Sequence, residues 1–159
     1  MTKRNSDEYE FLRRYSIDFS DAIHSIKIMS RYRSLEVQIP LIRDIVVTYG
    51  RPFSGNKSDG LSNHRLSSKV YVPKRFQGLH QELIRLRMQQ FAHSDLRYFK
   101  PKVKRFPGKR GDFYPMSFAG YDYSGLINRL PEISELIREV EGRVQSSIER
   151  FEGSSSSIC

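Results

Sequence analysis

The sequence is poor in cysteine and has no long apolar runs. Its one cysteine, Cys159, is the last of 159 residues, which excludes an intrachain disulfide and a metal cluster held by cysteines. No apolar run approaches the ~20 residues that a membrane-spanning helix requires, and residues 1–10 lack the apolar core of a signal peptide. We therefore expect a cytoplasmic protein that is neither secreted nor embedded in a membrane, and we predict no metal and no cofactor.

Acidic residues are missing from one stretch, residues 97–111. This stretch has seven basic residues, which leaves only +2 of the formal net charge of +9 for the rest of the chain. The seven are Arg97, Lys100, Lys102, Lys104, Arg105, Lys109 and Arg110. One interpretation is a solvated basic loop, and the other is a surface that neutralises the phosphates of a nucleic acid.

Aromatic residues flank the turn signal Pro-Gly-Lys-Arg-Gly at residues 107–111, which predicts a β-hairpin. Cations interleaved with rings are typical of a surface for single-stranded nucleic acid, since cations neutralise phosphates and rings stack on bases. The alternative is that the rings face the helices and only the charges face water.

Four segments place apolar side chains three or four residues apart, the spacing that lines one face of an α-helix. They are residues 7–32, 34–49, 79–96 and 131–152. Pro40 interrupts the second, so that this helix is either kinked or begins anew at the proline. The last segment is the most regular, and Gly153 is expected to end it.

The polar residues 50–68 show no periodicity and are expected to form a loop. Among the histidines, His24 is interpreted as structural, His64 as solvated and His80 as a surface residue. We predict a mainly α fold: an up-and-down bundle of four or five helices, with a small basic β-hairpin inserted before the last helix. Residues 1–152 form a single domain in this prediction, and residues 153–159 form a disordered Ser-rich tail.

The third helical segment ends in the only constellation that suggests catalysis. Arg87 is followed six positions later by His93, and then by Ser94 and Asp95. On an ideal helix, six positions correspond to roughly 240° around the axis. Arg87 and His93 could therefore meet only if the helix loosens near Ala92, or across a dimer.

The residues LRMQQFAHSD, which contain these positions, resemble the Arg-x(4–6)-His motif of the HEPN superfamily of helical toxin and abortive-infection domains. Residues 34–57 also look like a segment that accompanies such a helix in that group. The resemblance implies a homodimer that cleaves RNA without a metal, with Arg87, His93, Ser94 and Asp95 at the catalytic site. Met88 departs from the family pattern, in which a polar residue usually follows the arginine.

Arg43, Asp44 and Arg51 are candidates for supporting this motif. Arg43 and Asp44 interrupt an apolar run, where a charge is costly unless it is paired or faces a site. They either pair with another helix or reach His93.

Two functions follow from these patterns. In the first, which the resemblance implies, the chain is a metal-independent endoribonuclease of a toxin–antitoxin or phage-defence system. His93 would then transfer protons, and Arg87 would hold the phosphate. In the second, the chain is a non-catalytic module for binding or interaction, and His93 caps its helix, an effect of about 0.3–1 kcal/mol. The expected partners are RNA, a second copy of the chain, and an antitoxin or defence-system protein.

Overall fold

The computed structural model describes residues 3–54, 56–58, 61–91, 102–117 and 121–155. Four helices in these ranges have ten residues or more: α1 (Lys3–Met29), α2 (Leu35–Gly50), α4 (Gln77–Leu86) and α7 (Leu130–Ser155). Shorter pieces are α3 (Ser68–Tyr71), α6 (Tyr123–Asn128), the 3-10 turns η1 (Arg51–Phe53) and η2 (Lys74–Phe76), and the π-helical turn η3 (Arg87–Phe91). The predicted mainly α fold is confirmed.

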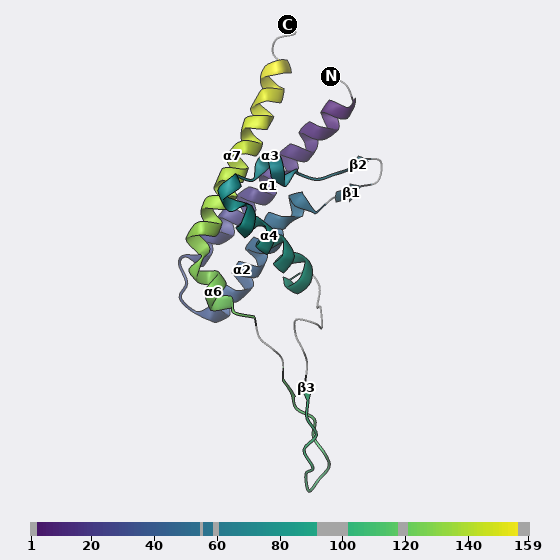
Figure 1. Cartoon of the computed structure of the whole chain (residues 1–159), viewed down its shortest axis with the longest axis vertical. Helices are drawn as coiled ribbons and strands as arrows, with labels where there is room; N and C mark the ends of the chain where they lie inside the picture. The colour runs from purple at the N-terminus through teal and green to yellow at the C-terminus, as the bar shows by residue number, and fades with distance from the viewer. Residues whose placement is uncertain (1–2, 55, 59–60, 92–101, 118–120, 156–159) are drawn as a thin grey trace.

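Helix α1 forms the centre of the bundle and packs along both α2 and α7. It runs antiparallel to each of them, so that its first residues lie beside the end of α7 (Figure 1). The apolar stripes that the periodicity predicted are the buried ones. On α1 they include Phe11, Leu12, Tyr15, Phe19, Ala22 and Met29, and on α7 they include Ile133, Leu136, Ile137, Val140, Val144 and Ile148. Removing these side chains from water is the main force that holds the three helices together.

The helix boundaries differ from the expected ones in two places. Helix α2 runs through Pro40, so a new helix does not begin at the proline. Pro40 has no amide hydrogen, so one carbonyl of the preceding turn loses its helical hydrogen bond. Because Pro40 is exposed, water can donate a hydrogen bond to that carbonyl instead. Helix α7 continues to Ser155 and is not ended by Gly153.

The predicted loop at residues 50–68 contains regular structure. After η1, the short strands β1 (Asn56–Ser58) and β2 (Leu61–His64) pair in an antiparallel hairpin. His64 is not solvated as expected, because its ring stacks on Phe11 with 4.7 Å between centroids. The Tyr15 hydroxyl also donates to the His64 carbonyl at 2.9 Å, which fastens β2 to α1. His24, in contrast, is exposed on α1.

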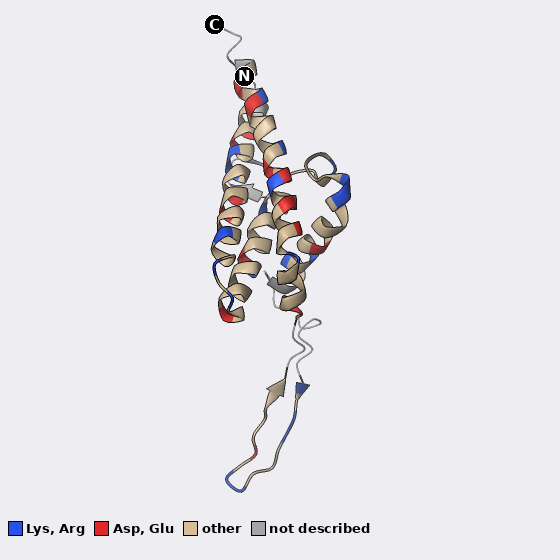
Figure 2. Ribbon diagram, turned by 90° about the vertical axis from the view of Figure 1, so that its left-hand side faces the viewer, with Lys and Arg blue, Asp and Glu red and all other residues tan. Residues whose placement is uncertain are grey.

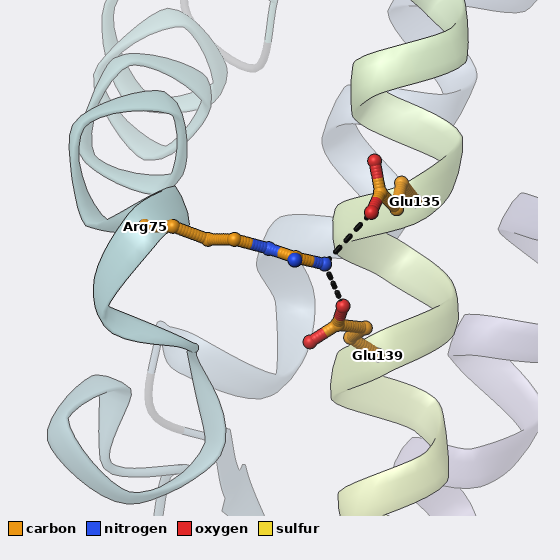
Figure 3. A network of polar contacts seen from close by, with 3 residues as sticks. All are labelled: Arg75, Glu135 and Glu139. Carbon is orange, nitrogen blue, oxygen red and sulfur yellow. Dashed lines mark hydrogen bonds and ion pairs between the residues drawn. The ribbon is translucent and has the colours of Figure 1, made fainter.

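Arg75 connects the segment before α4 to α7. One guanidinium nitrogen lies 2.7 Å from a carboxylate oxygen of Glu135 and also bonds to Glu139 (Figure 3). These groups are exposed, and such ion pairs contribute about 0–1 kcal/mol. The neighbouring Phe76 is buried beneath the Arg75 guanidinium, at 4.7 Å, and its burial holds the start of α4 against the bundle.

The second hairpin lies between α4 and α6. Strands β3 (Lys102–Val103) and β4 (Met116–Ser117) pair in an antiparallel ladder, as predicted for this part of the chain. None of the helices in the described ranges combines the length and the apolar character needed to cross a bilayer.

Candidate functional site

The hairpin at residues 102–117 projects beyond one end of the helical body (Figure 2). Phe106 and Phe113 exchange both backbone hydrogen bonds, at 2.9 and 3.0 Å, and extend the ladder toward the tip. Gly111 has φ +127°, a conformation that side chains with a Cβ rarely adopt, and this allows the tight turn. The turn signal thus led to the correct prediction of both the hairpin and its position.

The pairing determines which side chains share a face of this hairpin. Lys102 pairs with Ser117, and Phe106 pairs with Phe113 in the same register. Because side chains alternate along a strand, Lys102, Lys104, Phe106 and Phe113 lie on one face. Two cations and two rings, stacked with 5.4 Å between their centroids, therefore line the same side.

All side chains at residues 102–117 are exposed, rings as well as charges. Phe113 and Tyr114 are 61% and 60% exposed. The alternative in which these rings face the helices is therefore wrong for this part of the chain. Exposed apolar side chains that are grouped on one surface are a common feature of binding sites.

Five of the seven predicted phosphate-binding cations lie on the described hairpin: Lys102, Lys104, Arg105, Lys109 and Arg110. Arg105 is held by Asp112, with 2.7 Å between Nε and the carboxylate oxygen. The other four have no ion-pair partner among the described residues. Arg97 and Lys100 lie outside the described residues.

Arg87 starts the π-helical turn η3, so the helix widens at the arginine itself, and Ala92, where the loosening was expected, lies outside the described residues. Its side chain lies against the end of α2, where a Cβ on Gly50 would come within 2.3 Å of the Arg87 Cδ. The Arg87 Nε is buried and has no hydrogen-bond partner in the described part of the chain. His93, Ser94 and Asp95 lie outside that part, so the motif is described only at its arginine.

A second guanidinium stands near Arg87. Arg51 forms an ion pair of 3.4 Å with Asp18 of α1. The pKa of Arg87 is lowered mainly by burial and to a smaller extent by the positive charge of Arg51. Burial also raises the pKa of Asp18, against the opposing effect of Arg51. Two cations and one carboxylate leave an excess positive charge, and this suits an anion such as a phosphate.

Arg43 and Asp44, the other two supporting candidates, are exposed on α2. The Asp44 carboxylate accepts a hydrogen bond of 2.9 Å from the Ser25 hydroxyl of α1. Asp44 thus contacts another helix, one of the two expected alternatives. The other alternative, a contact with His93, is not tested, because His93 lies outside the described residues.

His80 is a buried residue that the sequence analysis placed on the surface. Its Nδ1 is 2.8 Å from the hydroxyl of Tyr49, which is also buried, and its ring packs edge-on against Phe53. His80 lies three positions before Leu83 and seven before Arg87, the spacing of one helix face, and this was the available signal. In the described ranges, no three His, Cys, Asp or Glu side chains gather in an arrangement that could hold a metal ion.

Burial lowers the pKa of His80 to about 4, from an ordinary value near 6.5. The unfolded chain therefore binds more protons than the folded chain between these two values, and stability falls as the pH falls through this window. We expect the free energy of unfolding in urea to drop by about 2 kcal/mol between pH 7 and pH 5. The His80→Gln variant should lose most of this dependence, and an unchanged slope in that variant would assign the effect to other groups.

No family model, curated protein or solved structure matches this chain, so the candidate sites rest on the geometry and on the motif alone.

Proposed function

We propose that this chain binds single-stranded RNA through the hairpin at residues 102–117. The observation that carries the proposal is the shared face of Lys102, Lys104, Phe106 and Phe113, on which cations and exposed rings lie side by side. Cations on such a face attract phosphates, and the rings offer stacking worth about 1–3 kcal/mol per base. Neither contact depends strongly on the base sequence.

The test is to replace Lys102, Lys104 and Arg105 together by Ala. Affinity for unrelated single-stranded RNAs should fall by about the same factor for each RNA, because the three cations bind phosphates, which every RNA carries. The slope of log affinity against log salt should also become shallower, by about 0.7 for each phosphate that the variant no longer neutralises. Both quantities come from fluorescence anisotropy titrations at several salt concentrations.

Two control variants sharpen this test. Replacing Lys27, Arg31 and Arg33 by Ala removes the same charge from exposed positions near the turn between α1 and α2, and it should change binding little. Asp112→Asn removes the carboxylate that holds Arg105 and should strengthen binding. Equal losses of affinity in the hairpin variant and in the body variant would show that only net charge matters, which contradicts the proposal.

A second candidate function is metal-independent cleavage of the bound RNA, as the resemblance to the HEPN superfamily implies. The observation that favours it is the Arg87 guanidinium, which is half-buried, lacks a partner for its Nε among the described residues and lies near Arg51. A planar fork of donors in that position suits a phosphate whose charge grows in the transition state. In this proposal His93 transfers the proton, with Ser94 and Asp95 beside it.

The biological setting in this second proposal is a cytoplasmic toxin–antitoxin or phage-defence system. Two copies of the chain would bring their arginine and histidine motifs together, and an antitoxin or defence-system protein would be the natural partner. RNA binding by the hairpin requires none of this, so the two functions can be tested separately.

A further inference from the structure

A cavity of about 400 Å³ lies between η1, the segment that leads into α3, and α4. A second hollow of about 310 Å³ continues it along α4. The two share Ser68, His80 and Ile84 in their walls, so they lie side by side, and together they are called the recess. The size of each part is at the lower end of the range of small-molecule binding sites.

The charged residues that line this recess are all cations. Arg65 and Lys69 line the first part, and Arg85 lines the second. All three are exposed, and none has an ion-pair partner among the residues that the structure describes. No Asp or Glu side chain is among the described residues that line either part. The unbalanced positive charge favours an anionic ligand.

His80 lines both parts of the recess and is the residue there with a titratable ring. Its Nδ1 lies 2.8 Å from the Tyr49 hydroxyl, which can donate to or accept from Nδ1, according to the tautomer of the imidazole. In the tautomer in which Tyr49 donates, the neutral imidazole carries its own proton on Nε2, and the proposal below uses this tautomer. No hydrogen-bond partner of Nε2 is among the described residues, so in this tautomer it keeps a donor for a ligand of the recess that His80 lines.

The remaining wall is apolar and partly aromatic. Phe53, Leu66 and Ile84 line the first part, and Met88 lines the second. The Phe53 and His80 rings meet edge to face with 4.5 Å between centroids and form one side of the recess. An apolar wall, one donor and a cationic rim fit a ligand with a flat ring at one end and a phosphate at the other.

We propose that this recess binds a mononucleotide, with its phosphate at Arg65, Lys69 and Arg85 and its base against Phe53 and Ile84. A base acceptor would receive the hydrogen bond from the His80 Nε2. The nucleotide is either free or the phosphorylated end of an RNA strand, since both present the same groups. This inference goes beyond the proposed function, because the hairpin takes no part in it.

Isothermal titration calorimetry of the whole chain tests this proposal with adenosine 5′-monophosphate, uridine 5′-monophosphate, adenosine and inorganic phosphate. At least one nucleotide should bind about tenfold more tightly than both adenosine and phosphate, because only the nucleotide engages wall and rim together. A 5′-phosphorylated tetranucleotide and its unphosphorylated counterpart then distinguish the two sources. Preference for the phosphorylated strand over the mononucleotide assigns the recess to RNA ends, and the reverse preference assigns it to free nucleotides.

Two variants locate the binding. Ile84→Trp fills the recess and should remove nucleotide binding, and Lys69→Ala with Arg85→Ala should weaken it about tenfold or more. The second variant changes only exposed side chains, so the test stands even if Ile84→Trp does not fold. Lys27→Ala with Arg33→Ala removes equal charge outside the recess and should leave binding unchanged.

The proposal is overturned if neither nucleotide nor the phosphorylated strand binds. It is also overturned if binding survives unchanged in a folded Ile84→Trp variant and in the Lys69 and Arg85 variant. The hairpin variant with Lys102, Lys104 and Arg105 replaced should retain nucleotide binding, so loss of RNA binding and loss of nucleotide binding remain separate results.

Discussion

Replacing residues 102–117 by a short Gly-Ser linker is expected to weaken binding of single-stranded RNA by about two to three orders of magnitude near physiological salt. The replacement removes the four hairpin cations that have no ion-pair partner among the described residues, together with the face shared by Phe106 and Phe113. It buries and exposes nothing in the bundle, because every side chain in this stretch is exposed. The midpoint of thermal unfolding should therefore stay within about 2 °C of the parent.

A narrower replacement separates stacking from charge. Changing Phe106 and Phe113 to Ala leaves the charge of the hairpin intact, and it should lower affinity without changing the salt slope. The alanine variant of Lys102, Lys104 and Arg105 should lower affinity as well, but it should also flatten the slope. RNA binding by the linker variant at parental strength would place the RNA surface elsewhere.

Arg87→Ala is expected to abolish cleavage of a fluorescent single-stranded RNA in EDTA, by a factor of about 10² or more. We expect little loss of stability, since the Arg87 Nε makes no hydrogen bond within the described part of the chain and the neighbouring Arg51 repels the charge. Arg87→Lys should fail as well, because an ammonium lacks the planar fork. His93→Ala should give the same loss of cleavage.

The Gly50→Ala variant tests whether cleavage depends on the position of the Arg87 side chain. Its new methyl group would occupy the space of the Arg87 Cδ and would push the flexible arginine aside without removing it. Cleavage should fall while RNA binding stays, whereas Arg138→Ala, an exposed change on α7, should alter neither. A parent chain that binds RNA but does not cleave it in EDTA would reduce the function to binding.

The elements predicted correctly from the sequence are those whose information is local. The stripes of α1 and α7 repeat every three or four residues, and residues 107–111 specify a tight turn. Both signals can be read without knowing what packs against them. The short strands β1 and β2 show no alternation of apolar and polar residues, so they could not be predicted from this pattern.

The features missed by the sequence analysis depend on contacts between distant segments. His80 is buried because Tyr49 and Phe53, which lie about thirty positions earlier in the sequence, pack against its ring. The buried Arg87 Nε has no hydrogen-bond partner within the described residues. The spacing of residues along the sequence cannot predict that such a partner is missing. The recess beside His80 is likewise formed by three segments: η1, the residues before α3, and helix α4. These segments share no local sequence pattern.

The π-helical turn η3 has a consequence for how this chain tolerates changes in length. A π-helical turn holds one residue more than an α-helical turn, so losing a single codon within residues 88–90 would let α4 continue as an α-helix through this point. Each residue advances an α-helix by about 100° around its axis, but the wide turn already takes up the extra residue, so the exit at Phe91 should keep nearly its direction. Helices α1, α2 and α7 would keep their sequences. A deletion at this turn should therefore be tolerated, whereas the same loss inside α1 or α7 would turn every later apolar side chain of that helix by about 100° away from the core.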